Sequence, residues 1–183
     1  TSDRRAGEPA GKQLDREFAD RICKREKAMA ENKKTATKTQ FWLFKSEPNT
    51  WSWDDQCARG TKGEHWDGVR NFLANKNMKA MAVGDRGFFY HSVNEKRIMG
   101  SVRVIREHYP DHTDPKGRFG MVDIMALETA SHHVTLAEVK NEPKLADMAL
   151  VTNSRLSVQP VTPAQWKRVC KMAGLDPDRD TPT

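Results

Sequence analysis

The chain has 183 residues, of which 37% are hydrophobic and 31% charged, with a formal net charge of +6. This length suffices for one ordinary domain with its own core, and five Trp with seven Phe exclude a chain that is disordered throughout. Three widely separated cysteines exclude a disulfide framework and a paired zinc motif, and no run of roughly 18 apolar residues predicts a membrane span.

The first residues, 1–39, are interpreted as a charged extension. Residues 1–40 hold 11 Lys/Arg against 7 Asp/Glu, so most of the positive charge lies there. Leu14, Phe18 and Ile22 form a short apolar stripe, which predicts at most a marginal helix from about residue 13 to residue 30. We therefore expect a flexible or weakly helical extension, a folded domain over 40–175 and a polar tail over 176–183.

The basic character and the cysteine usage suggest a compartment and a class of partner. A pI near 9.3 permits salt-sensitive attraction to nucleic acid, although charge alone carries no sequence readout. An odd number of cysteines and the lack of an apolar N-terminal segment favour a reducing compartment. We expect a soluble, cytoplasmic monomer that does not contact membranes.

The folded part begins with an aromatic run. Phe41 to Phe44 is short and apolar enough to predict a buried strand, which ends where the chain turns polar at Lys45. Ser52 and Asp55 have the spacing of a capping box and predict a short helix. Residues 60–63 then form a predicted loop.

The stretch Trp66-Asp67-Gly68-Val69-Arg70-Asn71 combines an aromatic ring, a glycine and two planar hydrogen-bonding side chains. Asp67 is expected to cap a helix that runs from Val69 to about Met81 and stops before Gly84. The same stretch could face a planar polar ligand. A capped helix with a core Trp and a solvated Arg predicts the same residues, so the stretch alone leaves both interpretations open.

The remaining elements predict a mixed fold. Residues 88–92, 98–105 and 118–128 read as three strands of an antiparallel meander, with a polar turn at 93–96 and a loop at 109–117. Capping boxes at Thr135/Glu138 and Thr162/Gln165 predict two helices, the last of which stops at Gly174. Residues 145–150 read as helix or turn, and 154–161 as a strand.

This order predicts an α+β fold in which strands follow one another without helical crossovers. We expect a small, curved, mostly antiparallel sheet or pseudo-barrel flanked by short helices.

Enzyme motifs are absent from the sequence. It contains no Gly-rich phosphate loop, no Gly-x-Ser-x-Gly elbow and no His-Glu-x-x-His. His132 and His133 are adjacent, which points their imidazoles apart and disfavours a metal site. His91 and Ser92 would face opposite sides of a strand and cannot form a base and nucleophile pair directly. We therefore expect no catalysis, no metal and no cofactor.

Polar side chains repeatedly follow aromatic ones. The groups are Phe44 before Lys45-Ser46-Glu47, Trp66 before Arg70-Asn71, Phe89-Tyr90 before His91-Ser92, and Arg155, Ser157 and Gln159 on one face of the last predicted strand. Together they supply stacking faces and fork-shaped donors and acceptors, the chemistry that holds a flipped base. Strand ends that meet solvent predict the same pattern.

Six ordered motifs over about residues 40–174 resemble the EVE domain family. They are Trp42-Leu43-Phe44-Lys45-Ser46-Glu47-Pro48, Trp66-Asp67-Gly68-Val69-Arg70-Asn71, Phe89-Tyr90-His91-Ser92, Tyr109-Pro110-Asp111, Met121-Val122-Asp123 and Ser154-Arg155-Leu156-Ser157-Val158-Gln159-Pro160. The departures are the long basic extension and a short loop at 111–118.

The resemblance implies a PUA-like fold, related to the YTH domain, that binds nucleic acid bearing a modified base without catalysis. Bases of the 5-methylcytosine type in DNA are the favoured ligands, and RNA is possible. The implied base pocket consists of Ser46, Glu47, Trp66, Val69, Asn71, Tyr90, His91, Ser92, Ser157, Val158 and Gln159. We expect Lys45, Arg70 and Arg155 to hold phosphates.

Within that pocket we expect Trp66 or Tyr90 to stack on the base, with Asn71 and Ser46 reading its edge. Two rival functions stay open: an RNA-binding adaptor without modified-base preference, and a hydrolase or RNA-processing enzyme that uses His91 or Glu47.

Whether Arg70 faces the pocket or the solvent also stays open, because successive helical residues cannot both face one site squarely. If only one does, we expect Asn71.

Overall fold

The computed structural model describes residues 39–182, so the extension and its predicted helix lie outside the described residues. The strands are β1 (Phe41–Ser46), β2 (Glu64–Trp66), β3 (Arg86–His91), β4 (Arg97–Pro110), β5 (Gly120–Thr129) and β6 (Val158–Val161). The helices are α2 (Trp53–Ala58), α3 (Phe72–Lys79), α4 (Leu136–Asn141), α5 (Ala149–Thr152) and α6 (Pro163–Ala173), with 3₁₀ turns η1 (Gly60–Lys62) and η2 (Pro143–Leu145).

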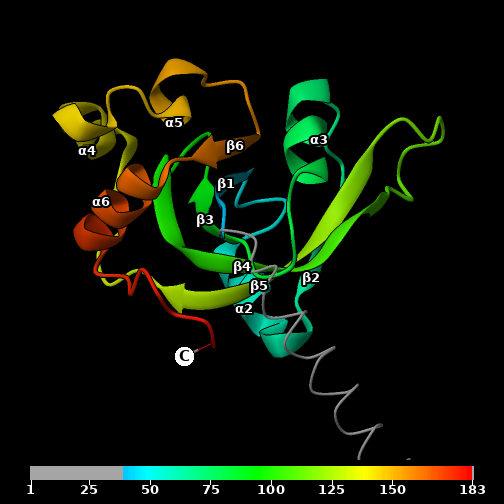
Figure 1. Ribbon diagram of the computed structural model, residues 1–183, viewed down its shortest axis with the longest axis horizontal. Coiled ribbons are helices and arrows are strands. Elements are labelled where there is room, and N and C mark those ends of the chain that lie inside the picture. The colour runs from blue at the N-terminus through cyan, green and yellow to red at the C-terminus, as the bar shows by residue number, and fades with distance from the viewer. Residues whose placement is uncertain (1–38, 183) are drawn as a thin grey trace, which may run out of the picture. The chain divides into compact units, whose positions relative to one another are not determined.

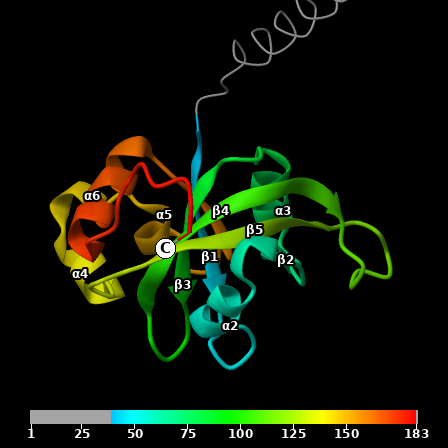
Figure 2. The same ribbon diagram turned by 90° about the horizontal axis from the view of Figure 1, so that it is seen from below.

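The strands form one open sheet of six, in the order β2-β5-β4-β3-β1-β6. The predicted meander is confirmed, because β3, β4 and β5 pair antiparallel in sequence. Strand β1 is parallel to β3, with Phe44 opposite Phe89, and its other neighbour β6 is antiparallel. Figures 1 and 2 show β4 and β5 bending along their length. The predicted α+β fold with a curved, mostly antiparallel sheet is confirmed.

Both faces of the sheet are covered by helices. Trp42 and Phe44 of β1 lie in one core with residues of α2 and α3, whereas Leu43 lies in a second core with Trp166 of α6. Figure 1 shows α4, α5 and α6 grouped together, away from α3. Side chains alternate along a strand, so a strand buried on both faces needs a continuous apolar run. This explains the aromatic start of the domain.

Three predicted helix starts are confirmed, each by a complete capping box. The boxes pair Ser52 with Asp55, Thr135 with Glu138 and Thr162 with Gln165. The last helix ends at Gly174, whose φ of 65° lies in the left-handed region that favours glycine. These boundaries follow from residues within one helical turn.

The predicted start of helix α3 is wrong. Helix α3 begins at Phe72, and its N-cap is Asn71, whose side-chain oxygen accepts from the Ala74 N–H at 3.0 Å. The preceding residues stay irregular because Gly68 has a φ of +69° and donates its N–H to the Asp111 carboxylate at 3.0 Å. Residues 67–70 therefore form a linker that is fixed by a residue of the β4–β5 loop.

The observed ends of other strands also differ from the predicted ones. Strand β4 extends through Pro110, into the predicted loop, and β5 starts at Gly120. Strand β6 starts at Val158, four residues later than predicted, so residues 154–157 form an irregular lead-in.

The segment after α6 packs against the sheet. The Pro177 carbonyl accepts from the Arg86 guanidinium at 2.5 Å and from the Trp166 indole N–H at 3.1 Å. Arg86 also donates to the Asp180 carboxylate at 2.5 Å. The polar tail is thus held by contacts with β3 and α6, while its assignment as a separate segment stays a prediction. Among the described helices, none has the length and apolar character needed to cross a bilayer.

Candidate functional site

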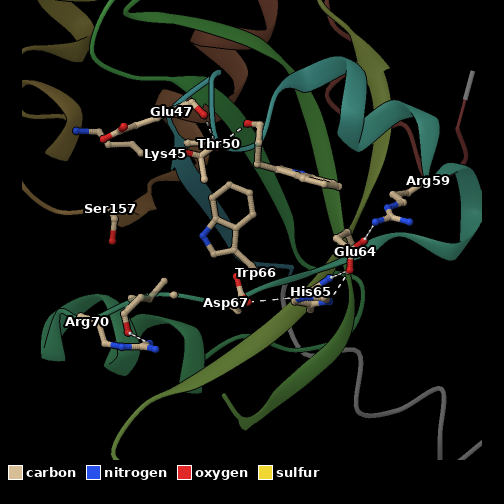
Figure 3. A pocket seen from close by; sticks show the side chains of 14 residues that line it. Lys45, Glu47, Thr50, Arg59, Glu64, His65, Trp66, Asp67, Arg70 and Ser157 are labelled. Atoms are coloured by element: carbon tan, nitrogen blue, oxygen red, sulfur yellow. Dashed lines mark hydrogen bonds and ion pairs between the residues drawn. The ribbon is translucent and has the colours of Figure 1, made fainter. Parts of the chain in front are cut away.

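A cavity of about 580 Å³ opens between the end of β1, strand β2 and the linker before α3. Its lining residues are Lys45, Ser46, Glu47, Thr50, Trp51, Arg59, Glu64, His65, Trp66, Asp67, Gly68, Val69, Arg70 and Ser157. Figure 3 shows the Trp66 indole at its centre. Small-ligand sites typically measure about 300–1,000 Å³, so a ligand of the size of a nucleobase fits.

Trp66, the last residue of β2, forms the aromatic wall of the cavity. Its ring packs edge to face against Phe44 and Phe89, with centroids 5.3 Å and 5.6 Å apart. Only 8% of Trp66 is exposed, so most of the side chain is core and the remainder faces the cavity. The wall is therefore rigid before any ligand arrives.

Trp51 adds a second aromatic surface. Its indole N–H donates to the Gln56 side-chain oxygen at 3.0 Å, and the Arg59 guanidinium lies over its ring at 5.4 Å from the centroid. Gln56 is fully buried and donates to the Ile124 carbonyl at 3.0 Å. Trp51 is thus anchored to the sheet through Gln56.

Polar groups without partners also line the cavity. Within residues 39–182, the side chains of Glu47, Thr50 and Ser157 make no hydrogen bond, and Figure 3 shows all three at the cavity. Lys45 donates from Nζ to the Ser154 carbonyl at 2.8 Å, and burial lowers the pKa of its ammonium group. The cavity therefore offers free donors and acceptors beside a positive charge.

Arg70 lines the cavity and is bound to the β4–β5 loop. Its guanidinium donates to the Asp111 carboxylate at 2.6 Å and to the Thr113 hydroxyl at 2.7 Å. Burial alone would raise the pKa of Asp111, but hydrogen bonds from Thr113, Arg70 and the Gly68 N–H outweigh it and lower the pKa to about 2. Arg70 thus lines the cavity while its charge is largely matched by Asp111.

Half of the predicted site residues lie together at this cavity. They are Lys45, Ser46, Glu47, Trp66, Val69, Arg70 and Ser157. Ser46 is not a free edge reader, because its hydroxyl donates to the Trp51 carbonyl at 2.6 Å. Asn71, the expected edge reader, is not among the lining residues, because its side chain caps α3.

The residues of β3 point elsewhere. Tyr90 lies in the second core, with Phe88 and Trp166, and burial raises its pKa to about 12. His91 is buried; its Nε2 accepts from the Trp53 N–H at 2.9 Å, so Nδ1 is the atom that donates to Glu95. Neither residue lines the cavity.

The remaining predicted residues support the wall or face solvent. The Ser92 hydroxyl donates to the Ser46 carbonyl at 3.0 Å. Val158 and Gln159 are buried, and the Gln159 amide donates to the Leu156 carbonyl at 2.9 Å. Arg155 is exposed and does not line the cavity.

The sequence interpretation missed seven lining residues as site residues. They are Thr50, Trp51, Arg59, Glu64, His65, Asp67 and Gly68. Trp51 had a usable signal, since it is an aromatic residue that follows the polar Thr50, five positions after the end of β1. Arg59 and Glu64 had none, because they meet through an ion pair of 2.6 Å across η1.

Comparison with known proteins places this geometry in a family. The family model of the EVE domain matches residues 40–172. Human thymocyte nuclear protein 1 is 32% identical, over 76% of this chain and 76% of the relative. The structure of Rpa0253 from Rhodopseudomonas palustris is 57% identical, covers 74% of this chain and 94% of its own, and has a TM-score of 0.71. A structure of human THYN1 in complex with DNA containing 5-methylcytosine is 30% identical, covers 75% and 99%, and has a TM-score of 0.69.

Proposed function

Because the chain belongs to the EVE domain family, we propose that it binds nucleic acid and takes one modified base, of the 5-methylcytosine type, into the cavity beside Trp66. The observation that carries the proposal is the cavity itself, in which one rigid aromatic wall faces unpartnered polar side chains. The human relative bound to 5-methylcytosine DNA supports the choice of ligand.

The lining residues suit the edge of a cytosine. Its exocyclic amine can donate a hydrogen bond to a carboxylate. Its ring carries acceptors, to which hydroxyl groups can donate. Glu47 would accept from the amine, and Thr50 or Ser157 would donate to the ring. These three replace Asn71 and Ser46 as the proposed edge readers, because the latter two are engaged in backbone hydrogen bonds.

Magnitudes limit the expected selectivity. Flipping a base costs a few kcal/mol and one aromatic stack returns about 1–3 kcal/mol, so stacking alone roughly breaks even. Burying one methyl group adds about 0.8 kcal/mol, a factor of about four. Affinity must then come from edge and phosphate contacts, and a preference far above fourfold would require specific contacts to the modification.

Binding without catalysis fits the state of His91 better than the hydrolase alternative. His91 is 4% exposed, and both ring nitrogens are engaged, with Trp53 and Glu95. A general base must reach the proton that it removes, directly or through one water. Glu47 does face the cavity, so product analysis after incubation with nucleic acid is the direct check on catalysis.

The test is a binding panel of short oligonucleotides that carry one 5-methylcytosine, one N6-methyladenine or no modification, as DNA and as RNA, at a stated salt concentration. We expect the 5-methylcytosine DNA to bind most tightly, with the oligonucleotide unchanged afterwards. Equal affinities for modified and plain probes would contradict the modified-base proposal and favour an RNA-binding adaptor. Cleaved or altered probes would favour an enzyme.

A pair of variants links binding to this cavity. Ser157→Leu fills the space beside Trp66. Ser154→Leu changes an exposed side chain of the same lead-in segment that does not line the cavity, and it keeps the main-chain carbonyl that accepts from Lys45. We expect Ser157→Leu to weaken binding of the modified probe at least tenfold and Ser154→Leu to leave it unchanged. Equal binding by both variants would place the ligand elsewhere.

A further inference from the structure

We propose that His65, Asp67 and His112 form a binding site for a divalent first-row transition metal ion of the Zn²⁺ class. Asp67 Oδ2 lies 3.6 Å from His65 Nε2 and 3.9 Å from His112 Nε2. The three ligand atoms all lie within 4.8 Å of one another. The sequence interpretation considered only the adjacent His132 and His133 and predicted no metal.

The spacing suits a single ion. Zn²⁺ binds imidazole nitrogen and carboxylate oxygen at about 2.0–2.2 Å, which places two tetrahedral ligand atoms roughly 3.3 Å apart. The two distances to Asp67 exceed this value by a few tenths of an ångström. All three side chains are at least one-third exposed, so small rotations can bring the ligand atoms onto one ion.

A carboxylate prepares one histidine for metal binding. Glu64 Oε1 contacts His65 Nδ1, and Glu64 Oε2 is held by Arg59 Nη2 at 2.6 Å. A carboxylate on one ring nitrogen fixes the proton there and leaves the other nitrogen with its lone pair. In this arrangement His65 Nε2, the atom near Asp67, is the free ligand.

The site joins two parts of the chain that are already held together. His65 and Asp67 flank Trp66 at the end of β2, whereas His112 lies in the β4–β5 loop. Next to His112, Asp111 accepts from the Gly68 N–H at 3.0 Å and from Arg70 at 2.6 Å. These contacts hold the loop against the linker, and they therefore keep the three ligands close together.

The composition of the site indicates which ions it would take. Two imidazoles and one carboxylate suit Zn²⁺, Ni²⁺, Cu²⁺ or Fe²⁺ rather than Ca²⁺ or Mg²⁺, which prefer oxygen ligands. Three protein ligands leave at least one coordination position for water or another ligand. His65 and Asp67 also line the cavity, so a bound ion would add positive charge to a wall that holds Glu64 and Asp67.

The experiment titrates the full chain, stripped with a chelator, with Zn²⁺ by calorimetry and with Co²⁺ by visible absorption. We expect one equivalent to bind with a dissociation constant in the micromolar range or tighter, and His65→Ala and His112→Ala each to weaken it at least tenfold. Glu64→Gln should weaken it by about 10–100-fold without removing a ligand, as positioning partners do. Magnesium should not compete.

The matched control is His132→Ala, which removes an exposed histidine that pairs with Glu138 away from the site. We expect this variant to bind Zn²⁺ as the wild type does. Unchanged binding in the His65→Ala/His112→Ala double variant, or a sulfur-to-cobalt absorption band that vanishes on mutation of a cysteine, would overturn the proposal. These metal titrations contain no nucleic acid, so their outcome tests the metal site independently of the proposed nucleic-acid binding.

Discussion

Trp66 packs edge to face against Phe89, with ring centroids 5.6 Å apart, so one side chain serves both the core and the cavity. A variant that removes it therefore changes two properties at once. Trp66→Ala is expected to lower the free energy of unfolding by about 3–5 kcal/mol, as large core truncations do, and to lose ligand binding as a consequence. Chemical denaturation measures the first effect.

Trp66→Phe is the matched control, because a smaller ring can keep edge contacts with Phe44 and Phe89. We expect it to lose much less stability than Trp66→Ala. An unchanged denaturation midpoint in Trp66→Ala would show that the ring is a surface feature, contrary to its 8% exposure.

Arg70 and Arg155 were both expected to hold phosphates, yet the structure gives them different surroundings. The side chain of Asp111 is 0% exposed, and Arg70→Ala removes the guanidinium group that forms an ion pair with its carboxylate. Removing a partner from a buried charge is costly, and because Arg70 is itself 39% exposed we expect a loss of about 1–3 kcal/mol.

Arg155→Ala removes an exposed side chain that has no ion pair among the described residues, so stability should change by less than about 0.5 kcal/mol. The melting temperatures of Arg70→Ala and Arg155→Ala, measured by thermal unfolding under the same conditions, test this difference in stability. Equal melting temperatures would contradict a structural role for Arg70.

The parts of this fold that the sequence predicted well depend on neighbours within a few residues. The three capping boxes each join residues three positions apart, and all three begin helices where expected. The start of α3 was misplaced because Asp67 and Asn71 are equally good caps locally. What separates them is the hydrogen bond from Gly68 to Asp111, 43 residues away, which no local pattern reveals.

The site was predicted in part for a related reason. Alternation along β3 shows that Phe89 and Tyr90 face opposite sides of the sheet, but not which side carries the cavity. The structure assigns Phe89 to the core beneath Trp66 and Tyr90 to the core beneath α6. Tyr90 and Trp66 therefore lie in different cores, and Trp66 lines the cavity whereas Tyr90 does not, although both follow the same aromatic-then-polar pattern.

Gly100 of β4 lies against the Trp53 ring and the Glu128 carbonyl, which leaves no room for a side chain. Gly100→Ala would place a Cβ inside van der Waals contact with both, and we expect a loss of at least about 1–3 kcal/mol from overpacking. Gly117→Ala is the control, because its Cβ would meet nothing within 4 Å although its φ is +60°.

The strained backbone at Gly117 should cost about 1 kcal/mol on substitution. Denaturant unfolding of both variants separates the steric cost from the backbone cost. If Gly117→Ala proved the more damaging, the close packing between β4 and α2 would be wrong.

Glu138 closes the capping box of α4, and the ionisation of its carboxyl group should make the stability of the protein depend on pH. It accepts from the Thr135 N–H at 2.8 Å and the Thr135 hydroxyl at 2.7 Å, and it pairs with His132 at 2.7 Å. These hydrogen bonds, with Thr135 first, lower the pKa of Glu138 from 4.5 to about 2. Because the folded pKa lies below the unfolded one, the stabilisation is complete above about pH 4.5 and is lost as the pH falls towards 2.

Carboxyl ¹³C shifts followed by NMR across this range measure the Glu138 titration directly. We expect a midpoint far below 4.5 in the wild type, and a higher midpoint in His132→Ala, which removes one of the hydrogen bonds that favour the charged form. Glu138→Gln should flatten the loss of stability between pH 5 and pH 2, since glutamine cannot take up the proton. A wild-type midpoint at the ordinary value would mean that the box does not hold the carboxylate in solution, and α4 would then begin without it.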